Sequence, residues 1–382
     1  MKRVAVYYPW IHLRGGAERV MLEIARRSCH RVTLFTHHLD LAQTFPEFRT
    51  LSALTVLGGV SVQRSFAGVL KACASIAREK LDLRGFDALL ITTDGVGEFL
   101  TLRNHAIPVL CFCHTPVRPV YDPVYRRVWL HGRPAARLPL AVFSFFYRWL
   151  TRLAWKHFRR VFVNGEEVRR RIAAGRICAL EKVEVLHPGV DLAGISPEFA
   201  HDRYFLYAGR IKWTKNVELA IDAFHAFRAA QGDSGWRLIV AGAVDPSSGD
   251  YVMALRQRAG DLGAVEFVEN PSDAELNTLY TRCYALVFPS LNEDWGLVPL
   301  EAMARAKPVL AVNRGGPTES IVHEETGFLL APTPEAFATK MTWLVEHPEA
   351  AKRMGALAVD RVRRYSWEAF VQRLDDYLER SC

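Results

Sequence analysis

The sequence lacks a long hydrophobic run. No apolar stretch reaches the roughly 18 residues that a membrane-spanning helix needs. The opening residues, Met1 to Tyr8, read as a strand and lack the apolar core and cleavage site of a signal peptide. These absences predict a cytoplasmic protein that is at most peripheral on the inner face of the cell membrane.

The cysteines are few and scattered. They are odd in number and form no CxxC pair, which argues against a disulfide framework or a zinc site and favours a reducing compartment. The seven are Cys29, Cys73, Cys111, Cys113, Cys178, Cys283 and Cys382. Cys111 and Cys113 alternate on one predicted strand just before His114, but one strand offers too few converging ligands for a metal. We therefore expect no metal site.

The dinucleotide fingerprint GxGxxG is also missing after the first predicted strand, which argues against an oxidoreductase that binds NAD or FAD. No nucleic-acid recognition motif accompanies the net charge of +8. The basic balance still favours an anionic partner, such as nucleotide phosphates or an anionic membrane.

Short apolar runs alternate with amphipathic stretches along the whole chain, a pattern typical of βα repetition. One set of predicted strands covers Val4–Tyr8, Val32–Phe35, Ala88–Ile91, Val109–Cys113 and Val161–Val163. A second set covers Tyr204–Tyr207, Arg237–Ala241, Val265–Val268, Ala285–Phe288 and Val309–Val312. The helical patterns between them include Ala17–Arg27, Phe66–Lys80, Val217–Ala230, Tyr251–Ala259, Asp273–Arg282 and Val298–Ala304. The predicted fold class is α/β, with two doubly wound parallel sheets in two Rossmann-like domains.

In the first half, two glycines follow the first predicted strand. Gly15 and Gly16 open a helix, where backbone N–H groups can approach a phosphate closely. His114 ends the strand Val109–Cys113, and catalytic side chains of open α/β sheets lie at such positions. A plain turn and a structural histidine are the alternatives.

In the second half, Gly209 and Arg210 follow the first strand, and Lys215 with Asn216 opens the next helix. The glycine permits close backbone approach, and the two cations could hold a diphosphate and stabilise it as a leaving group. Two solvated basic residues in a loop are the alternative.

The most specific string runs from Glu293 to Met303, after the strand Ala285–Phe288. Gly296 lies at the expected start of a helix, with Glu293 in the loop before it and Glu301 about one turn into the helix. Both carboxylates can therefore face one cleft, where each could accept hydrogen bonds from vicinal hydroxyls of a ribose or a sugar.

Together these strings resemble the family 4 retaining glycosyltransferases of GT-B fold. The resemblance spans nearly the whole chain and rests on the order and spacing of the matching strings. They are Gly15-Gly16-Ala17-Glu18, Gly209-Arg210 with Lys215-Asn216, Glu293 to Glu301, Pro308-Val309 and Gly315-Gly316. It implies an acceptor-binding domain over 1–195, a nucleotide-sugar-binding domain over 196–364, a central cleft that both domains face, and a helix over 365–382 that crosses back to the first domain.

The resemblance also implies roles for single residues. Glu301 would bind the ribose hydroxyls, Glu293 would lie beside the donor sugar, and Arg210 with Lys215 would bind the diphosphate. The further donor contacts that it implies come from Gly15, Gly16, Gly209, Trp295, Gly296, Leu297 and Val298, and, for the base, from Asn270 and Pro271. His114 stands where the family has a histidine near the sugar's hydroxymethyl group. The family usually has Phe in place of Trp295, which changes the volume beside the sugar pocket.

The family's mechanism uses no protein nucleophile. The acceptor attacks on the face from which the leaving group departs, so the enzyme positions the acceptor and neutralises the diphosphate. The resemblance thus implies that His114, Arg210, Lys215 and Glu293 are catalytic and that neither metal nor cofactor is required. The sequence agrees, because it contains no Asp-x-Asp metal motif.

The strings Phe112–Arg118 and Lys215–Ala220 most resemble mannosyltransferases of the family. They favour transfer of mannose from GDP-mannose to a glycan or a lipid-linked saccharide. A UDP-hexose or UDP-N-acetylhexosamine transferase with a soluble or secondary-metabolite acceptor is the alternative. A GT-B nucleotide-sugar epimerase is a third reading.

The segment 116–160 carries ten basic residues against one acid, Asp122, with aromatic residues between them. Within it, Leu138–Leu150 is too short to span a membrane and suits a helix that lies in an anionic membrane interface. A core helix with a solvated basic rim is the alternative.

Overall fold

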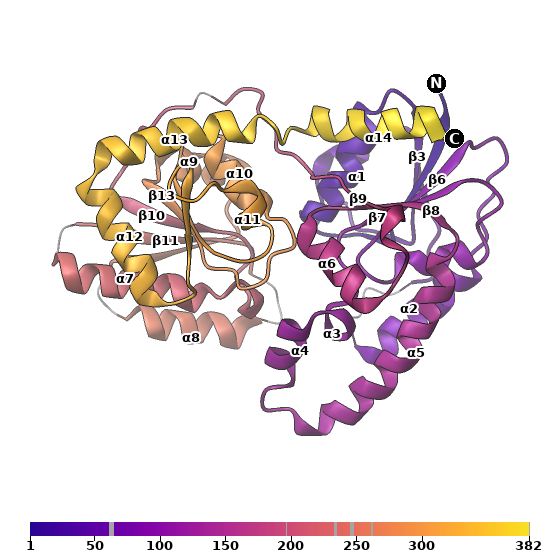
Figure 1. Cartoon of the computed structure of the whole chain (residues 1–382), viewed down its shortest axis with the longest axis horizontal. Coiled ribbons are helices and arrows are strands. Elements are labelled where there is room, and N and C mark those ends of the chain that lie inside the picture. Colours follow the sequence, from indigo (N-terminus) through magenta and orange to yellow (C-terminus); the bar gives the residue numbers. More distant parts are fainter. Residues whose placement is uncertain (61–64, 196, 233–234, 245–247, 261–262, 382) are drawn as a thin grey trace. The chain divides into compact units, whose positions relative to one another are not determined.

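The computed structural model describes residues 1–60, 65–195, 197–232, 235–244, 248–260 and 263–381. The chain divides into two compact units (Figure 1). The N-terminal unit holds Met1–Pro188 together with Trp367–Cys382, and the C-terminal unit holds Gly189–Ser366. The chain therefore changes units at 188/189 and at 366/367, where the sequence led us to expect changes at 195/196 and 364/365.

The N-terminal unit is built on a parallel sheet of seven strands in the order β5-β3-β1-β6-β7-β8-β9. Its strands are β1 (Arg3–Tyr7), β3 (Arg31–Thr36), β5 (Leu54–Val56), β6 (Ala88–Thr93), β7 (Val109–Cys113), β8 (Phe158–Val163) and β9 (Val183–Val185). Strands β2 (Trp10–Ile11) and β4 (His38–Leu39) form a separate parallel pair. Strands β6 and β7 are buried along their whole length, which explains why they read as unbroken apolar runs.

Helices cover both faces of this sheet. The α-helices are α1 (Gly16–Arg27), α2 (Phe66–Arg78), α3 (Arg118–Tyr121), α4 (Pro123–Leu130), α5 (Arg137–Trp155), α6 (Glu166–Gly175) and α14 (Trp367–Ser381). The short 3-10 helices are η1 (Pro46–Thr50), η2 (Gly97–Leu102), η3 (Pro134–Ala136) and η4 (Leu180–Lys182). Helices α2 and α5 and the turn η2 contribute to one core cluster, and α1 and α14 pack against each other (Figure 1).

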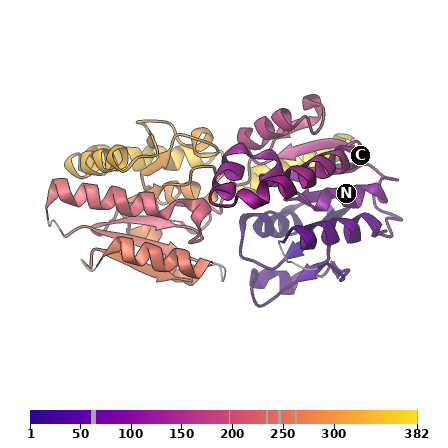
Figure 2. The same ribbon diagram turned by 90° about the horizontal axis from the view of Figure 1, so that it is seen from below.

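The C-terminal helix α14 is part of the N-terminal unit because its apolar side chains pack on that sheet. Phe370 lies edge-on to Phe112 of β7, and Tyr377 lies edge-on to Phe162 of β8, with ring centroids 5.4 Å and 5.2 Å apart. The Nζ of Lys2 donates a hydrogen bond to the backbone oxygen of Leu378 at 2.8 Å. The two chain ends accordingly lie side by side in both views (Figures 1 and 2).

The C-terminal unit has a parallel sheet of six strands in the order β12-β11-β10-β13-β14-β15. Its strands are β10 (Tyr204–Ala208), β11 (Arg237–Gly242), β12 (Val265–Glu269), β13 (Ala285–Phe288), β14 (Val309–Val312) and β15 (Gly327–Leu330). Its helices are α7 (Val217–Gln231), α8 (Gly249–Ala259), α9 (Asp273–Arg282), α10 (Leu297–Met303), α11 (Pro317–Ser320), α12 (Pro334–Glu346) and α13 (Pro348–Val362), with the 3-10 turn η5 (Trp213–Lys215). One face of the sheet packs on α7, α8 and α12, and the other packs on α9 and α10 (Figure 1).

The two segments at which the chain changes units lie side by side. The N–H of Val190 donates to the backbone oxygen of Tyr365 at 2.9 Å, and Val190 forms a β-bridge with Ser366. Between β9 and β10 the described residues form no helix or strand of two or more residues, as the turn-rich composition of 187–202 predicts; residue 196 lies outside the described part.

The prediction of an α/β fold with two parallel doubly wound sheets is confirmed. The sequence pattern missed the strands β5, β9 and β15, which lie at sheet edges and have only three or four residues. Partial exposure of β5 and β9 removes the apolar run that marks a central strand. No disulfide joins the six described cysteines, and Cys382 lies outside the described residues.

Among the described residues, no helix is both long and apolar enough to cross a membrane.

Candidate active site

The order of strands in the C-terminal unit places a switch point between β10 and β13. The chain leaves β10 toward β11 and β12, and then returns to the other side of β10 to form β13, β14 and β15. Open α/β sheets bind ligands beyond the carboxyl ends of the two strands at such a point. The loops that begin at Gly209 and at Pro289 are the ones that follow β10 and β13.

These two loops are joined through charged and polar side chains. The Nζ of Lys215 forms an ion pair with the Oε2 of Glu293. Beside it, the Nδ2 of Asn216 donates to the backbone oxygen of Pro289 at 3.1 Å, and the Oγ of Ser290 donates to the same Oε2 of Glu293 at 3.3 Å. The side chains of Lys215 and Glu293 are 22% and 16% exposed, so a ligand can still reach both.

The backbone around Arg210 is held from two sides. The hydroxyl of buried Tyr207 donates to the backbone oxygen of Arg210 at 2.9 Å. A Cβ on Gly242 would lie 1.7 Å from the backbone oxygen of Gly209, so the loops after β10 and β11 pass in direct contact. Arg210 itself is exposed. Burial, followed by the nearby charge of Glu293, raises the pKa of Tyr207 far above its ordinary value, while the charge of Arg210 acts in the opposite direction.

Glycines shape the loop that carries Glu293. The N–H of Gly316 donates to the backbone oxygen of Glu293 at 3.0 Å. A Cβ on Gly315 would lie 2.2 Å from that same oxygen, and a Cβ on Gly316 would lie 1.9 Å from the backbone oxygen of Trp295. No side chain fits at either position, so the strings Gly315-Gly316 and Glu293–Gly296 form one packed unit at the strand ends.

Trp295 and the start of α10 contribute backbone to this loop. The indole of Trp295 is buried and stacks edge-on against Tyr365 with ring centroids 5.1 Å apart. Because the indole lies in the core, the side chain is turned away from solvent, and what Trp295 can offer a ligand is its backbone. Gly296 has φ +90° and precedes the first residues of α10, Leu297 and Val298, both of which are half-buried.

Glu301 lies on α10 and is held by residues that the sequence analysis did not single out. The hydroxyl of buried Tyr280 donates to the Oε2 of Glu301 at 2.7 Å. Arg305 donates to the backbone oxygen of Glu301 at 2.8 Å and to the Oδ1 of Asn277 at 2.7 Å. The four-residue spacing of Glu301 on α10 and Arg305 in the turn after it was the available signal, whereas Tyr280 comes from α9 and is brought in by the fold.

Asn270 and Pro271 follow β12, which is the edge strand of the sheet and lies two strands from β10. Asn270 adopts φ +51°, its N–H donates to Gly242 at 2.9 Å, and its Oδ1 accepts the N–H of Val244 at 3.2 Å. The side chain of Asn270 therefore closes the loop after β11, and contact of Asn270 and Pro271 with a base stays a prediction.

In the N-terminal unit the switch point lies between β1 and β6, and His114 follows the neighbouring strand β7. The N–H of His114 donates to Thr93 at 2.9 Å, and its backbone oxygen accepts the Nδ2 of Asn164 at 2.9 Å. Its ring lies 5.9 Å from that of Tyr8, and the residue is 9% exposed. His114 is thus at a strand end as predicted, with its backbone fixed by both adjacent strands.

Gly15 precedes the first turn of α1, and Gly16 is the first residue of that helix. A Cβ on Gly15 would lie 2.6 Å from the Oε2 of Glu18, a buried carboxylate in the same turn. Phosphate contact by these two glycines stays a prediction.

A buried acid next to this edge was missed by the sequence analysis. Glu98 on η2 accepts a hydrogen bond from the Oγ1 of Thr93, and its other oxygen lies 3.1 Å from the hydroxyl of Tyr147 on α5. That hydroxyl donates to the backbone oxygen of Gly95. Burial raises the pKa of Glu98 above its ordinary range. The protonated acid can donate to Tyr147, which satisfies the network without a buried charge.

One group of side chains in the described part of the chain offers ligand atoms for a metal: Cys29, His30 and Glu379, within 4.8 Å of one another. Cys29 and Glu379 are exposed, and the backbone N–H of Lys2 approaches the Nδ1 of His30 at 3.4 Å. Cys29 and His30 directly precede β3, so the group lies at the amino ends of the strands, the opposite edge from His114.

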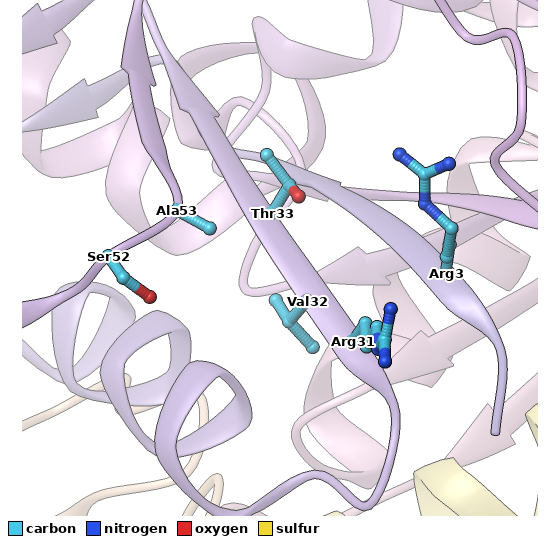
Figure 3. A pocket seen from close by; sticks show the side chains of 6 residues that line it. All are labelled: Arg3, Arg31, Val32, Thr33, Ser52 and Ala53. Carbon is cyan, nitrogen blue, oxygen red and sulfur yellow. The ribbon is translucent and has the colours of Figure 1, made fainter.

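A hollow on the described surface also lies at the amino ends of the strands. It is shallow and lined by the first residues of β1 and β3, Arg3 and Arg31, with Val32, Thr33, Ser52 and Ala53. Figure 3 shows Val32 and Thr33 along the central strand, with Ser52 and Ala53 on one side of it and Arg3 on the other. Open α/β sheets bind ligands at the other edge, so we do not assign the active site to this hollow.

Comparisons with known proteins identify the family of this chain. The family model of "Glycosyltransferase Family 4" matches residues 14–193, and that of "Glycosyl transferases group 1" matches residues 193–360. The alpha-1,3/1,6-mannosyltransferase ALG2 of Homo sapiens is 32% identical over 95% of this chain and 92% of its own. The enzyme of the same name from Dictyostelium discoideum is 31% identical over 99% of this chain and 98% of its own.

Among solved structures, the chain is similar to Anabaena Alr3699/HepE in complex with UDP. The TM-score is 0.74 at 19% identity, and the match covers 99% of this chain and 100% of that one. This likeness supports the GT-B architecture. With both family models matched in succession and full-length relatives above 30% identity, the chain belongs to the family 4 glycosyltransferases and is an enzyme that transfers a hexose.

Proposed function

We propose that this enzyme transfers mannose from GDP-mannose to a saccharide acceptor, and that the acceptor is linked to a lipid. The observation that carries the proposal is full-length similarity to two proteins named alpha-1,3/1,6-mannosyltransferase, combined with a cation and a carboxylate held at the switch point of the C-terminal sheet. The local strings Phe112–Arg118 and Lys215–Ala220 point to the same donor.

Lys215 and Arg210 are the residues that would stabilise the leaving diphosphate. An ammonium group has three N–H donors, so Lys215 can keep its ion pair with Glu293 and still donate to a phosphate oxygen. Arg210 is exposed in the same loop, five residues earlier, and offers a planar guanidinium that can bind a phosphate through two N–H groups. Two cations in place before the reaction would lower the barrier to leaving-group departure without a metal ion.

The two carboxylates would bind different parts of the donor. Glu301, with one oxygen held by Tyr280, has its other oxygen available for the ribose hydroxyls. Glu293, fixed by Lys215, Ser290 and the N–H of Gly316, would position the hydroxyls of the sugar. Neither carboxylate is required as a nucleophile if the acceptor attacks on the face from which the diphosphate leaves, which would retain the anomeric configuration.

We also propose that the enzyme works from the cytoplasm as a peripheral protein on the inner face of the cell membrane. The support is the basic, aromatic segment 116–160, in which the one acid, Asp122, is buried. A lipid-linked acceptor would be presented at such a surface.

The test is incubation of the purified enzyme with GDP-mannose and a lipid-linked saccharide acceptor, with NMR of the product. We expect transfer of one mannose in the α configuration, undiminished by EDTA. UDP-glucose and UDP-N-acetylglucosamine, tested in parallel, address the alternative donors. Turnover of the nucleotide sugar to a second sugar without any acceptor would instead identify an epimerase and overturn the proposal.

A further inference from the structure

The helix α5 (Arg137–Trp155) has two apolar faces. One face packs into the N-terminal unit and consists of Leu140, Ser144, Tyr147, Thr151, Ala154 and Trp155. Their spacing of three and four residues is that of a helix with one core-facing stripe. A core helix of this kind ordinarily shows charged and polar residues on its opposite side.

The opposite side of α5 is apolar and exposed. Its residues are Leu138, Val142, Phe145, Phe146 and Trp149, again with helical spacing. Leu138, Phe145 and Trp149 are 74%, 71% and 58% exposed, and these five make up almost half of the exposed large hydrophobic residues in the described part of the chain. Single exposed apolar residues are ordinary, but several side by side on one helix mark an interaction surface.

The structure also separates the aromatic residues of segment 116–160 into two groups. Tyr121, Tyr147, Trp155 and Phe158 are buried in the core of the N-terminal unit. These four aromatic residues cannot contact a membrane. The exposed aromatic residues of the segment are Phe145, Phe146 and Trp149 on α5, and three others, Tyr125, Trp129 and Phe143, are half-buried.

The exposed charges on α5 and on the chain just before and after it have one sign. Exposed basic residues precede it, lie along it and follow it: Arg127, Arg133, Arg137, Arg152, Lys156 and Arg159. The single acid of the segment, Asp122, is 2% exposed and lies 3.5 Å from Arg171. Arg148 is engaged within the unit, because it donates to Val120 at 2.9 Å and lies over the ring of Tyr121. Arg152 also donates to the backbone oxygens of Arg176 at 3.2 Å and Gly175 at 3.4 Å and keeps its charge at the surface. An apolar strip bordered by positive charge is complementary to a lipid surface with anionic headgroups.

We infer that the outer face of α5 is the element that docks this enzyme on an anionic lipid bilayer. The inference rests on the proposed function and deepens it, because that proposal named the segment 116–160 but not the face that makes the contact. Leu138, Val142, Phe145, Phe146 and Trp149 enter the boundary between headgroups and acyl chains, and the surrounding arginines bind headgroup phosphates. A helix of 19 residues, about 28 Å long, lies flat in this boundary.

A second copy of this chain is a poorer occupant of the same face. In a two-fold dimer each patch meets itself, so the six exposed cations of one copy would face those of the other. Juxtaposed like charges cost free energy, whereas anionic headgroups neutralise every one of them.

The test is flotation of the full-length protein with vesicles of phosphatidylcholine alone and of phosphatidylcholine with phosphatidylglycerol. The wild type is expected to float with the anionic vesicles at low salt, and less with neutral vesicles or at high salt. The variant F145S/F146S/W149S is expected to bind the anionic vesicles at least tenfold more weakly. The matched control M253S/L357S, which removes two exposed apolar side chains of the C-terminal unit, is expected to float like the wild type.

Charge is tested separately from apolar contact. Each of R133Q and R137Q is expected to weaken vesicle binding by about fivefold. The control R363Q, in which an exposed arginine of the C-terminal unit is neutralised, is expected to leave binding unchanged. Trp149 provides a direct signal: the vesicle-induced blue shift of tryptophan fluorescence is expected to be lost in W149F, while W149F still floats.

Three outcomes would overturn the inference. They are a wild type that binds no anionic vesicle at low salt, a triple variant that floats as well as the wild type, and a wild-type dimer in solution that the triple substitution dissociates. Flotation needs no donor or acceptor, so failure of the mannosyltransferase proposal leaves this result intact. Conversely, transfer to a soluble saccharide fragment is expected to persist in the triple variant.

Discussion

The carboxyl edges of the two sheets are built in different ways. In the C-terminal unit, loops after different strands are tied to one another through charged side chains and glycine contacts, as in the pairs Lys215 with Glu293 and Gly316 with Glu293. In the N-terminal unit, the loop after β6 is tied inward by three buried side chains, Thr93, Glu98 and Tyr147. The first edge keeps fixed charges within reach of solvent, and the second buries its acid, which raises the pKa of Glu98.

This difference fits a division of labour between the units. A diphosphate needs cations that are oriented before it arrives, and the ion pair of Lys215 with Glu293 orients one. The N-terminal unit instead carries the one extended apolar surface of the described chain, on α5. The comparison predicts that substitutions at the first edge act on the chemical step, whereas those in the second unit act on stability or on where the enzyme works.

The largest expected effect is on turnover at the charged edge. Lys215→Ala, Arg210→Ala and Glu293→Ala are each expected to lower kcat of mannosyl transfer by about 10² or more, because preorganised electrostatic groups are lost. The control is Glu266→Ala, which breaks the exposed ion pair with Arg237 along β11 and β12 and should leave kcat unchanged. Near-normal rates in all three variants would remove these residues from the active site.

The glycine contacts are expected to matter next. Gly315→Ala places a Cβ 2.2 Å from the backbone oxygen of Glu293 and should cost about 3 kcal/mol of stability, together with at least a tenfold loss of transfer activity. Gly260 has the same φ of +68° but no atom within 4 Å of its added Cβ, so Gly260→Ala carries only the cost of a positive-φ backbone, about 1 to 3 kcal/mol, and should be the less destabilising of the two. Equal melting temperatures for the two variants would show that the contact with Glu293 is not tight.

A smaller effect is expected from the hydroxyl that orients Glu301. Tyr280→Phe should raise KM for the donor about tenfold with little change in kcat, because a hydrogen bond to a charged group is worth about 1.5 kcal/mol. Tyr204→Phe is the matched control, since that hydroxyl donates to the backbone of Leu279 in the same unit. A change confined to kcat would show that Glu301 does not contribute to donor binding.

The smallest expected effect concerns the buried acid of the N-terminal unit. Folding raises the pKa of Glu98, so its contribution to stability is complete below the unfolded pKa, about 4.3, and is lost as pH rises through the folded pKa. The loss in wild type should approach at most about 1.4 kcal/mol per pH unit. Glu98→Gln, which stays neutral, should therefore melt at progressively higher temperature relative to wild type as pH rises above about 4. A difference in melting temperature that is independent of pH would contradict a protonated Glu98.

The sequence alone predicted the central strands. It also predicted that most of the candidate residues follow the carboxyl ends of these strands. Fully buried parallel strands, such as β7 and β13, are continuous apolar runs, and a residue just after such a run must lie at the carboxyl edge. Residues that act through long-range contact were not predictable in this way. Tyr280 reaches Glu301 and Tyr147 reaches Gly95 only once helices pack on the sheets, and neither has a local motif.

The segment 116–160 shows the same limit. Its composition indicated a basic, aromatic surface, but the helical periodicity of the sequence alone could not show which aromatic residues face the core. Tyr147 and Trp149 are two residues apart on α5, yet one is 2% exposed and the other 58%. Packing of α5 against η2 and the sheet decides which of the two stripes is buried.

The most direct measurement is a thermal-shift screen of the wild type with GDP-mannose, GDP, UDP-glucose, UDP-N-acetylglucosamine, UDP and NAD. A donor present at 100 times its dissociation constant adds about 2.7 kcal/mol of stability, so a specific donor should be visible. Stabilisation by GDP-mannose and GDP, reduced in Lys215→Ala, is the expected result. Stabilisation by uridine nucleotides alone would contradict the proposed donor.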